Sequence, residues 1–142
     1  MKKLFIIGLI AASLTSCSTA LYYWGSSLSG VSSYEKLSYG FYDRQTPESV
    51  CELVAMYENI INHPGGTRNC PPPGVCAEYG YLLLMPGTAE TFEKYATPRQ
   101  RKCFSTSAYA SSFRTLGLEM LNKEMQLYPE SVEFIKPLLK KF

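Results

Sequence analysis

The clearest pattern in the chain is an apolar stripe with the period of an α-helix. The stripe consists of Val50, Leu53, Val54, Tyr57, Ile60 and Ile61, which are spaced so that they share one face. Thr46 is a favourable N-cap for such a helix, and Pro47 suits its first position. Pro64 disfavours helical geometry in the residue before it, and two glycines follow. The pattern therefore predicts an amphipathic helix that begins at Pro47 and stops at His63.

Helical patterns also account for most of the remaining chain. Further helices are expected over 34–42, over 75 to about 85, over 88–96, from about 107 to 127, and from 132 onward with a kink near Pro137. No stretch shows the alternation of apolar and polar residues that marks a strand. The predicted fold class is all-α, with helices joined by short or moderate loops.

The N-terminus has the pattern of a secretory signal peptide. Two lysines precede the apolar run 4–14, which is too short to span a bilayer. The run closes with Leu14-Thr15-Ser16-Cys17, which resembles the lipobox of bacterial lipoproteins. In that family the cysteine receives a diacylglyceryl group, the peptide is cut before it, and the new amino terminus is acylated. The alternative is an ordinary signal peptide in which Cys17 is one more disulfide partner.

These features divide the chain into a signal peptide over 1–16, a lipidated tether over 17–33 and a helical domain over 34–142. Ser18 is not the Asp that retains lipoproteins in the inner membrane, so the resemblance implies the periplasmic face of an outer membrane. The tether is expected to become ordered where Tyr22 to Trp24 dock. Its aromatic residues suit either packing against the helices or a platform for peptidoglycan.

Charge excludes one class of partner. The chain has 14 Lys and Arg against 12 Asp and Glu. Lys2 and Lys3 belong to the predicted signal peptide, and without them 12 basic residues balance 12 acidic ones. No net charge remains to attract nucleic acid, so the membrane contact is expected through the lipid anchor.

Four cysteines remain in the predicted helical domain, and in an oxidising compartment they predict two disulfides. Three pairings are available to Cys51, Cys70, Cys76 and Cys103. If the helices around Cys51 and Cys76 are antiparallel neighbours, Cys51 lies about 17 Å along its helix from the end nearest Cys70. We therefore favour Cys51 with Cys103 and Cys70 with Cys76.

Enzymatic chemistry is less favoured by the same residues. The closest cysteines are six positions apart, unlike a C-x-x-C redox site. His63 and three cysteines have the right atoms for zinc without a finger spacing, and His63 is the only histidine available to a cysteine hydrolase. No phosphate-binding loop motif occurs. We expect no catalytic residues, no metal and no cofactor.

Three stretches carry a resemblance to a known family. They are Leu21-Tyr22-Tyr23-Trp24-Gly25, the run from Pro72 to Leu82 (PPGVCAEYGYL) and the run from Glu124 to Ser131 (EMQLYPES). They resemble the small bacterial lipoproteins of domain of unknown function family 4810. The resemblance implies an outer-membrane lipoprotein, often encoded beside a lipoprotein similar to the curli secretion channel, with no established enzymatic activity.

The same region resembles a tetratricopeptide repeat. Gly80 and Gly87 match the close-packing and turn positions of the first helix, and Gly117 and Pro129 match the second helix and its end. The spacing between Gly87 and Gly117 is too long for one repeat. Either a segment is inserted between the paired helices, or residues 88–96 form the second helix and Ser107 begins another unit.

A tetratricopeptide-like helical hairpin array offers a groove for a partner helix or peptide. The sequence therefore favours a non-enzymatic adaptor that binds an envelope protein or a secretion assembly, with Tyr79, Leu83 and Tyr128 as candidate partner-binding residues. The alternative is a structural lipoprotein that binds peptidoglycan or another glycan through its aromatic segment.

Overall fold

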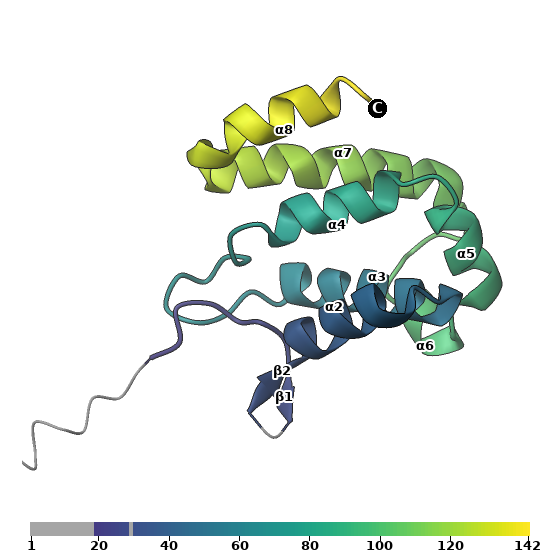
Figure 1. Ribbon diagram of the computed structural model, residues 1–142, viewed down its shortest axis with the longest axis horizontal. Helices are drawn as coiled ribbons and strands as arrows, with labels where there is room; N and C mark the ends of the chain where they lie inside the picture. The colour runs from purple at the N-terminus through teal and green to yellow at the C-terminus, as the bar shows by residue number, and fades with distance from the viewer. Residues whose placement is uncertain (1–18, 29) are drawn as a thin grey trace, which may run out of the picture.

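The structure, a computed structural model, describes residues 19–28 and 30–142. The predicted signal peptide and the predicted lipidation site Cys17 lie outside the described residues. Helices dominate the part that is described (Figure 1), which confirms the all-α prediction. The elements are β1 (Ser27–Leu28), β2 (Val31–Ser32), α2 (Ser33–Arg44), α3 (Pro47–Asn62), α4 (Val75–Leu84), α5 (Thr88–Tyr95), α6 (Pro98–Arg101), α7 (Tyr109–Leu127), η1 (Pro129–Ser131) and α8 (Val132–Leu139).

Strands make only a small contribution. Strands β1 and β2 form an antiparallel hairpin of two residues each, which the hydrophobic pattern did not indicate because two residues are too few to alternate. Across the described residues, no helix combines the length and the apolar character needed to cross a membrane.

Helix α3 begins and ends where the sequence predicted. The Thr46 hydroxyl accepts a hydrogen bond from the backbone N–H of Ser49 at 3.2 Å, and Pro47 is the first helical residue. The predicted stripe is buried except for Val50, which is half-buried. Met56 is buried as well, because α3 packs against α2, α4 and α5 and so has neighbours on more than one side.

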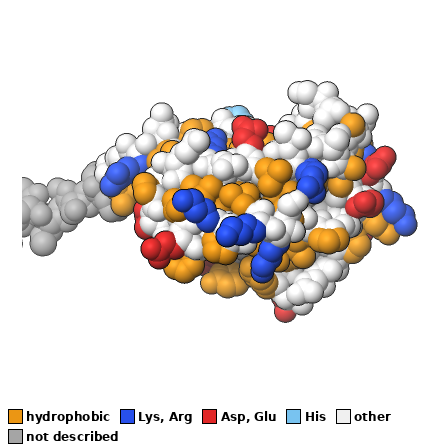
Figure 2. All heavy atoms as spheres, turned by 90° about the horizontal axis from the view of Figure 1, so that it is seen from above, with side chains coloured by type: hydrophobic (Ala, Val, Ile, Leu, Met, Phe, Trp, Pro, Cys, Tyr) orange, Lys and Arg blue, Asp and Glu red, His pale blue; other side chains and the backbone are white. Residues whose placement is uncertain are grey.

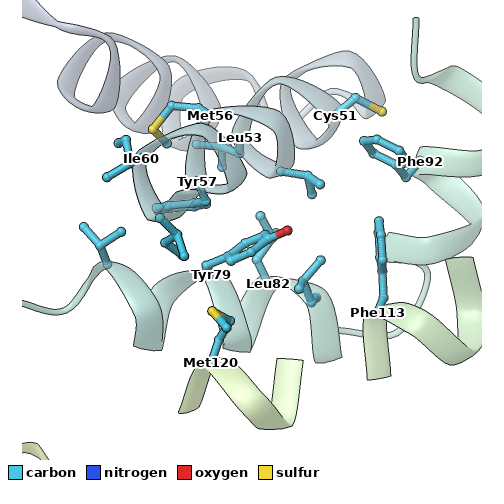
Figure 3. Close-up of a cluster of buried hydrophobic side chains, with 14 of the residues drawn as sticks. Cys51, Leu53, Met56, Tyr57, Ile60, Tyr79, Leu82, Phe92, Phe113 and Met120 are labelled. Atoms are coloured by element: carbon cyan, nitrogen blue, oxygen red, sulfur yellow. The ribbon is translucent and has the colours of Figure 1, made fainter. Parts of the chain in front are cut away.

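The longer helices are stacked in layers, and their axes run along the long dimension of the molecule (Figure 1). Helix α2 packs on α3, α3 on α4, α4 on α7 and α7 on α8. One end of the stack is closed by α5 and α6. The other end carries the loop between α3 and α4, the turn between α7 and α8, and the N-terminal segment. Figure 3 shows the core on both sides of α4. The rings of Tyr57 of α3 and Tyr79 of α4 stack with their centroids 5.7 Å apart, and Met120 of α7 lies on the side of α4 that faces α7.

Helices α4 and α7 cross in close contact at Gly80 and Gly117. A Cβ atom on Gly80 would lie 2.7 Å from the carbonyl oxygen of Gly117, so only glycine fits there. Gly80, which was matched to a close-packing position, therefore contacts Gly117, which was matched to the second helix. This contact decides between the two pairings that the sequence left open: α5 and α6 are inserted between the paired helices α4 and α7.

The inserted segment is held to the core by aromatic rings. Phe92 of α5 is fully buried, and its ring centroid lies 5.1–5.3 Å from those of Phe104, Tyr109 and Phe113. The Arg101 guanidinium donates to the backbone carbonyl groups of Ala96 and Glu93 at the end of α5. Arg101 thus satisfies carbonyl groups that the end of α5 leaves free.

The N-terminal segment is packed well before residue 34. Backbone N–H groups of Thr67 and Arg68 donate to the carbonyl groups of Ala20 and Leu21, each at 3.0 Å. Gly25 is buried, and the ring of Trp24 lies 4.9 Å from that of Tyr34. The aromatic side chains of this segment thus pack against the helices.

Candidate functional site

The structure places two of the three predicted partner-binding residues in the core. Tyr79 is 0% exposed and Leu83 is 3% exposed, so neither side chain can contact a partner. The Tyr79 hydroxyl instead donates to Glu58 at 2.7 Å. These two assignments were wrong because α4 is enclosed between α3 and α7, and no face of its apolar run Leu82–Leu84 could be identified as outward from the sequence.

Tyr128 has a structural contact of its own. Its hydroxyl donates to the carbonyl oxygen of Pro71 at 2.6 Å and lies 3.7 Å from the Cys70 sulfur. The side chain thereby ties the end of α7 to the proline loop before α4. Sequence reasoning identified the residue but not this partner.

Exposed aromatic side chains line a groove between α2, α3 and α4. The groove has a volume of about 310 Å³. We call it the aromatic groove, and its lining consists of Ser38, Phe41, Tyr42, Gln45, Leu53, Tyr57, Glu78, Tyr81, Leu82 and Met85. Tyr42 is 72% exposed, Tyr81 45% and Met85 40%. Other exposed rings, such as Tyr39 and Phe134, lie outside the groove, but here three exposed large side chains share one hollow of the surface.

Among the described residues, Glu78 is the only charged one that lines the aromatic groove. Its carboxylate is exposed and is held from one side by two phenols. The Tyr57 hydroxyl donates to Oε2 at 2.8 Å, and the Tyr34 hydroxyl lies 2.8 Å from Oε2 and 3.0 Å from Oε1. Burial, reinforced by the neighbouring carboxylate, raises the pKa of both phenols. They stay protonated at neutral pH and remain donors.

This arrangement gives the aromatic groove a definite binding chemistry. A fixed carboxylate beside exposed aromatic rings attracts a cation, because the carboxylate is negatively charged and the ring faces have a negative electrostatic potential. The apolar side chains around it suit the aliphatic or aromatic parts of the same ligand. The contact of Glu78 with Tyr34 and Tyr57 could not be predicted from the sequence, because the three residues lie on different helices.

The four cysteines of the helical domain are free thiols in the structure, so neither predicted disulfide is formed. The Cys51 sulfur lies 3.8 Å from the Thr91 carbonyl oxygen on α5. Cys103 is a separate, exposed thiol after α6. Cys76 is fully buried in α4, and Cys70 faces the Tyr128 hydroxyl.

The buried thiols are also poor nucleophiles. Burial raises the pKa of Cys51 to about 11 and that of Cys76 to about 12, so both remain protonated at neutral pH. Cys103 is exposed at the edge of a second cleft of about 500 Å³ beside α6, and partial burial raises its pKa as well. None of these thiols is activated by its surroundings.

The residues considered for zinc are not brought together. His63 lies in the exposed loop after α3, with Nδ1 3.0 Å from the carbonyl oxygen of Asn59. Within residues 19–28 and 30–142, no group of three or more His, Cys, Asp and Glu side chains is placed to hold a metal ion. The candidate functional site is therefore the aromatic groove. Comparison with known proteins adds no relative, since no family model, curated protein or solved structure matches the chain.

Proposed function

We propose that the protein is an outer-membrane lipoprotein, anchored through Cys17 on the periplasmic face, that acts as a non-enzymatic adaptor for an envelope or secretion assembly. The anchor is supported by the signal-peptide pattern and the lipobox-like sequence before Cys17. Adaptor function is supported by the aromatic groove, which offers apolar surface and one carboxylate but no activated nucleophile among its described residues.

The occupant that fits the aromatic groove best is a peptide segment of a partner protein with an Arg or Lys between apolar residues. Charge complementarity carries this choice, because Glu78 is the single charge among the described lining residues. A guanidinium or ammonium group can reach the Glu78 carboxylate from the open side while its apolar neighbours contact Tyr42 and Tyr81. A helical hairpin array of the tetratricopeptide kind binds peptides by the same general means.

A peptide-display selection on the immobilised domain tests this choice directly. Selected peptides should carry a basic residue flanked by apolar ones. Glu78→Gln should weaken their binding about two- to fivefold, as expected for an exposed charge pair. Glu90→Gln on α5 removes an exposed carboxylate outside the aromatic groove and should leave binding unchanged. Selection of acidic peptides, or equal binding by Glu78→Gln and wild type, would contradict the proposal.

Photo-crosslinking in intact envelopes tests the surface independently of the peptide chemistry. A protein adduct formed from a probe in the aromatic groove should disappear when both Tyr42 and Tyr81 are changed to Ala. The matched control is Phe134→Ala, which removes an aromatic ring of 79% exposure on α8. If the adduct survives the double substitution, the aromatic groove is not the binding surface.

The second candidate is a lipoprotein that binds peptidoglycan. It is favoured by the rings of Tyr39 and Tyr42, which are 70% and 72% exposed on α2 and could stack on a sugar. Sedimentation with purified cell-wall sacculi separates the two functions. An adaptor stays in the supernatant, whereas a peptidoglycan-binding lipoprotein is found in the pellet.

A further inference from the structure

The attachment of the N-terminal segment to the helices limits how far the domain can stand from its anchor. Thr67 and Arg68 bind the carbonyl groups of Ala20 and Leu21 through their backbone N–H groups. A Cβ on Gly66 would lie 2.5 Å from the Leu21 carbonyl oxygen, so the loop and the segment are in close contact. Only three peptide units separate Ala20 from Cys17, and three residues span at most about 10 Å.

We propose that the end of the molecule formed by Leu21 and the loop over 63–69 rests on the membrane surface, with the Met85 end of the aromatic groove turned away from it. This inference rests on the proposed lipid anchor at Cys17. An anchor only about 10 Å long keeps this end next to the lipid headgroups. The domain is therefore oriented on the membrane and does not swing freely on a long tether.

The side chains at this end suit a bilayer interface. Leu21 is 58% exposed, although it lies in a packed segment, and an exposed leucine next to an anchor can enter the boundary between headgroups and acyl chains. Arg68 is exposed and is the only Lys, Arg, Asp or Glu in the loop over 63–74. Its guanidinium can pair with the phosphate groups of lipids.

The face formed by α8 is the competing contact surface. Figure 2 shows this face from above, with Lys and Arg side chains among hydrophobic ones. Helix α8 is separated from α4 by α7, and two helix spacings amount to about 16–20 Å. A connection of about 10 Å that starts beside the loop before α4 is too short to bring this face onto the membrane.

The same orientation leaves the far end of the aromatic groove on the periplasmic side. The groove runs along α4 from Glu78, about 5 Å along the helix from Val75 at the membrane-facing end, to Met85, about 15 Å from Val75. Gln45 lies at the C-terminal end of α2, which points the same way as Met85 (Figure 1). A partner can then enter the aromatic groove from its Met85 end without displacing lipid.

Photo-crosslinking of the acylated full-length protein in vesicles of phosphatidylethanolamine and phosphatidylglycerol tests the orientation. Benzoylphenylalanine is placed, one position at a time, at Leu21, Thr67, Glu90 and Phe134, all of which are exposed. Lipid adducts should form at Leu21 and Thr67 and stay at background at Glu90 on α5 and Phe134 on α8. A yield at Glu90 or Phe134 that equals or exceeds the yield at Thr67 would overturn the inference.

A spacer variant checks that the short connection is the cause. Ten Gly and Ser residues inserted between Ser18 and Thr19 add a flexible segment of about 17 Å, and the adduct yield at Thr67 should fall. An unchanged yield means that the orientation does not depend on the short connection, which overturns the proposed cause. Mass spectrometry of each sample reports acylation of Cys17. A wrong orientation of acylated protein overturns only this inference, whereas missing acylation overturns the anchor and the orientation together.

Discussion

Replacing Gly80 by Ala tests whether the α4–α7 crossing has the close contact that the structure shows. The new Cβ would lie 2.7 Å from the Gly117 carbonyl oxygen and 3.1 Å from the Leu121 backbone nitrogen. Ordinary contact begins at 3.4 Å, so the two backbones must move apart by about 0.7 Å, the difference between 3.4 and 2.7 Å. A gap of this size costs a quarter to a half of the dispersion energy of each contact across the crossing.

The expected result follows from two opposing effects. Overpacking in a close-packed core costs about 1–3 kcal/mol and sometimes more, whereas Ala is favoured over Gly within a helix by about 1 kcal/mol. Because backbone atoms on both helices must move, we expect Gly80→Ala to lower the free energy of unfolding by about 1–3 kcal/mol. Gly117→Ala should cost less, because its closest contact at 2.7 Å is the Leu84 side chain, which can turn aside in part.

Gly40→Ala is the matched control. Gly40 lies in α2, and its added Cβ would meet only the Arg44 guanidinium at 3.6 Å, an ordinary contact. This variant should gain about 0.5–1 kcal/mol from helix propensity alone. Urea unfolding followed by circular dichroism measures all three, with a slope of about 1–3 kcal/mol per M. A Gly80→Ala protein as stable as wild type would refute the crossing.

Three further predictions concern pH, thiols and the N-terminal segment. Glu124 is 2% exposed and accepts a hydrogen bond from the backbone N–H of Gly74 at 2.7 Å, and burial raises its pKa against the opposing effect of the N–H groups at the start of α4. A carboxyl group whose pKa is raised by folding stabilises the protein below the unfolded-state pKa of about 4.3, and this stability is lost as pH rises through the folded-state pKa. Glu124→Gln should therefore abolish this decrease in the free energy of unfolding with rising pH. Thiol titration with a chromogenic disulfide should label Cys103 in the folded protein and Cys51 only after unfolding, and a protein that labels at neither after unfolding contains disulfides. Gly66→Ala should destabilise the protein by more than about 1 kcal/mol, because Gly66 has a φ of +75° and the added Cβ would meet the N-terminal segment. The variant should also be cleaved more readily by proteases before residue 25. Equal proteolysis of the variant and the wild type would contradict the contact between Gly66 and this segment.

Local signals in the sequence were sufficient for most of the helices. Thr46 and Pro47 begin α3, and Pro64 with two glycines ends it, because caps and breakers act on the backbone within a few residues. The helix predicted over 88–96 also ends as expected, but the short helix α6, which Thr97 caps, was not predicted. The two-residue hairpin was missed because it has too few positions to show any period.

Burial in the centre of the stack could not be predicted in the same way. The apolar run in α4 is enclosed by neighbours on two sides, so Tyr79 and Leu83, which were expected to meet a partner, are core residues. Which face of a uniformly apolar helix is outward depends on where other helices pack, and that information is not local. The aromatic groove was missed for the same reason, since its lining comes from three helices.

The sequence by itself determined most of the helices, the ends of α3 and the expectation of a lipid anchor, because each of these depends on residues that are close together along the chain. Only the tertiary structure decided that Gly80 meets Gly117, that Glu78 is held by Tyr34 and Tyr57, and that the segment after the predicted anchor is bound to the loop over 65–68. Each of these contacts joins residues far apart along the chain. Such contacts form only when whole helices pack against one another, because the free energy that aligns them comes from burying shared surfaces.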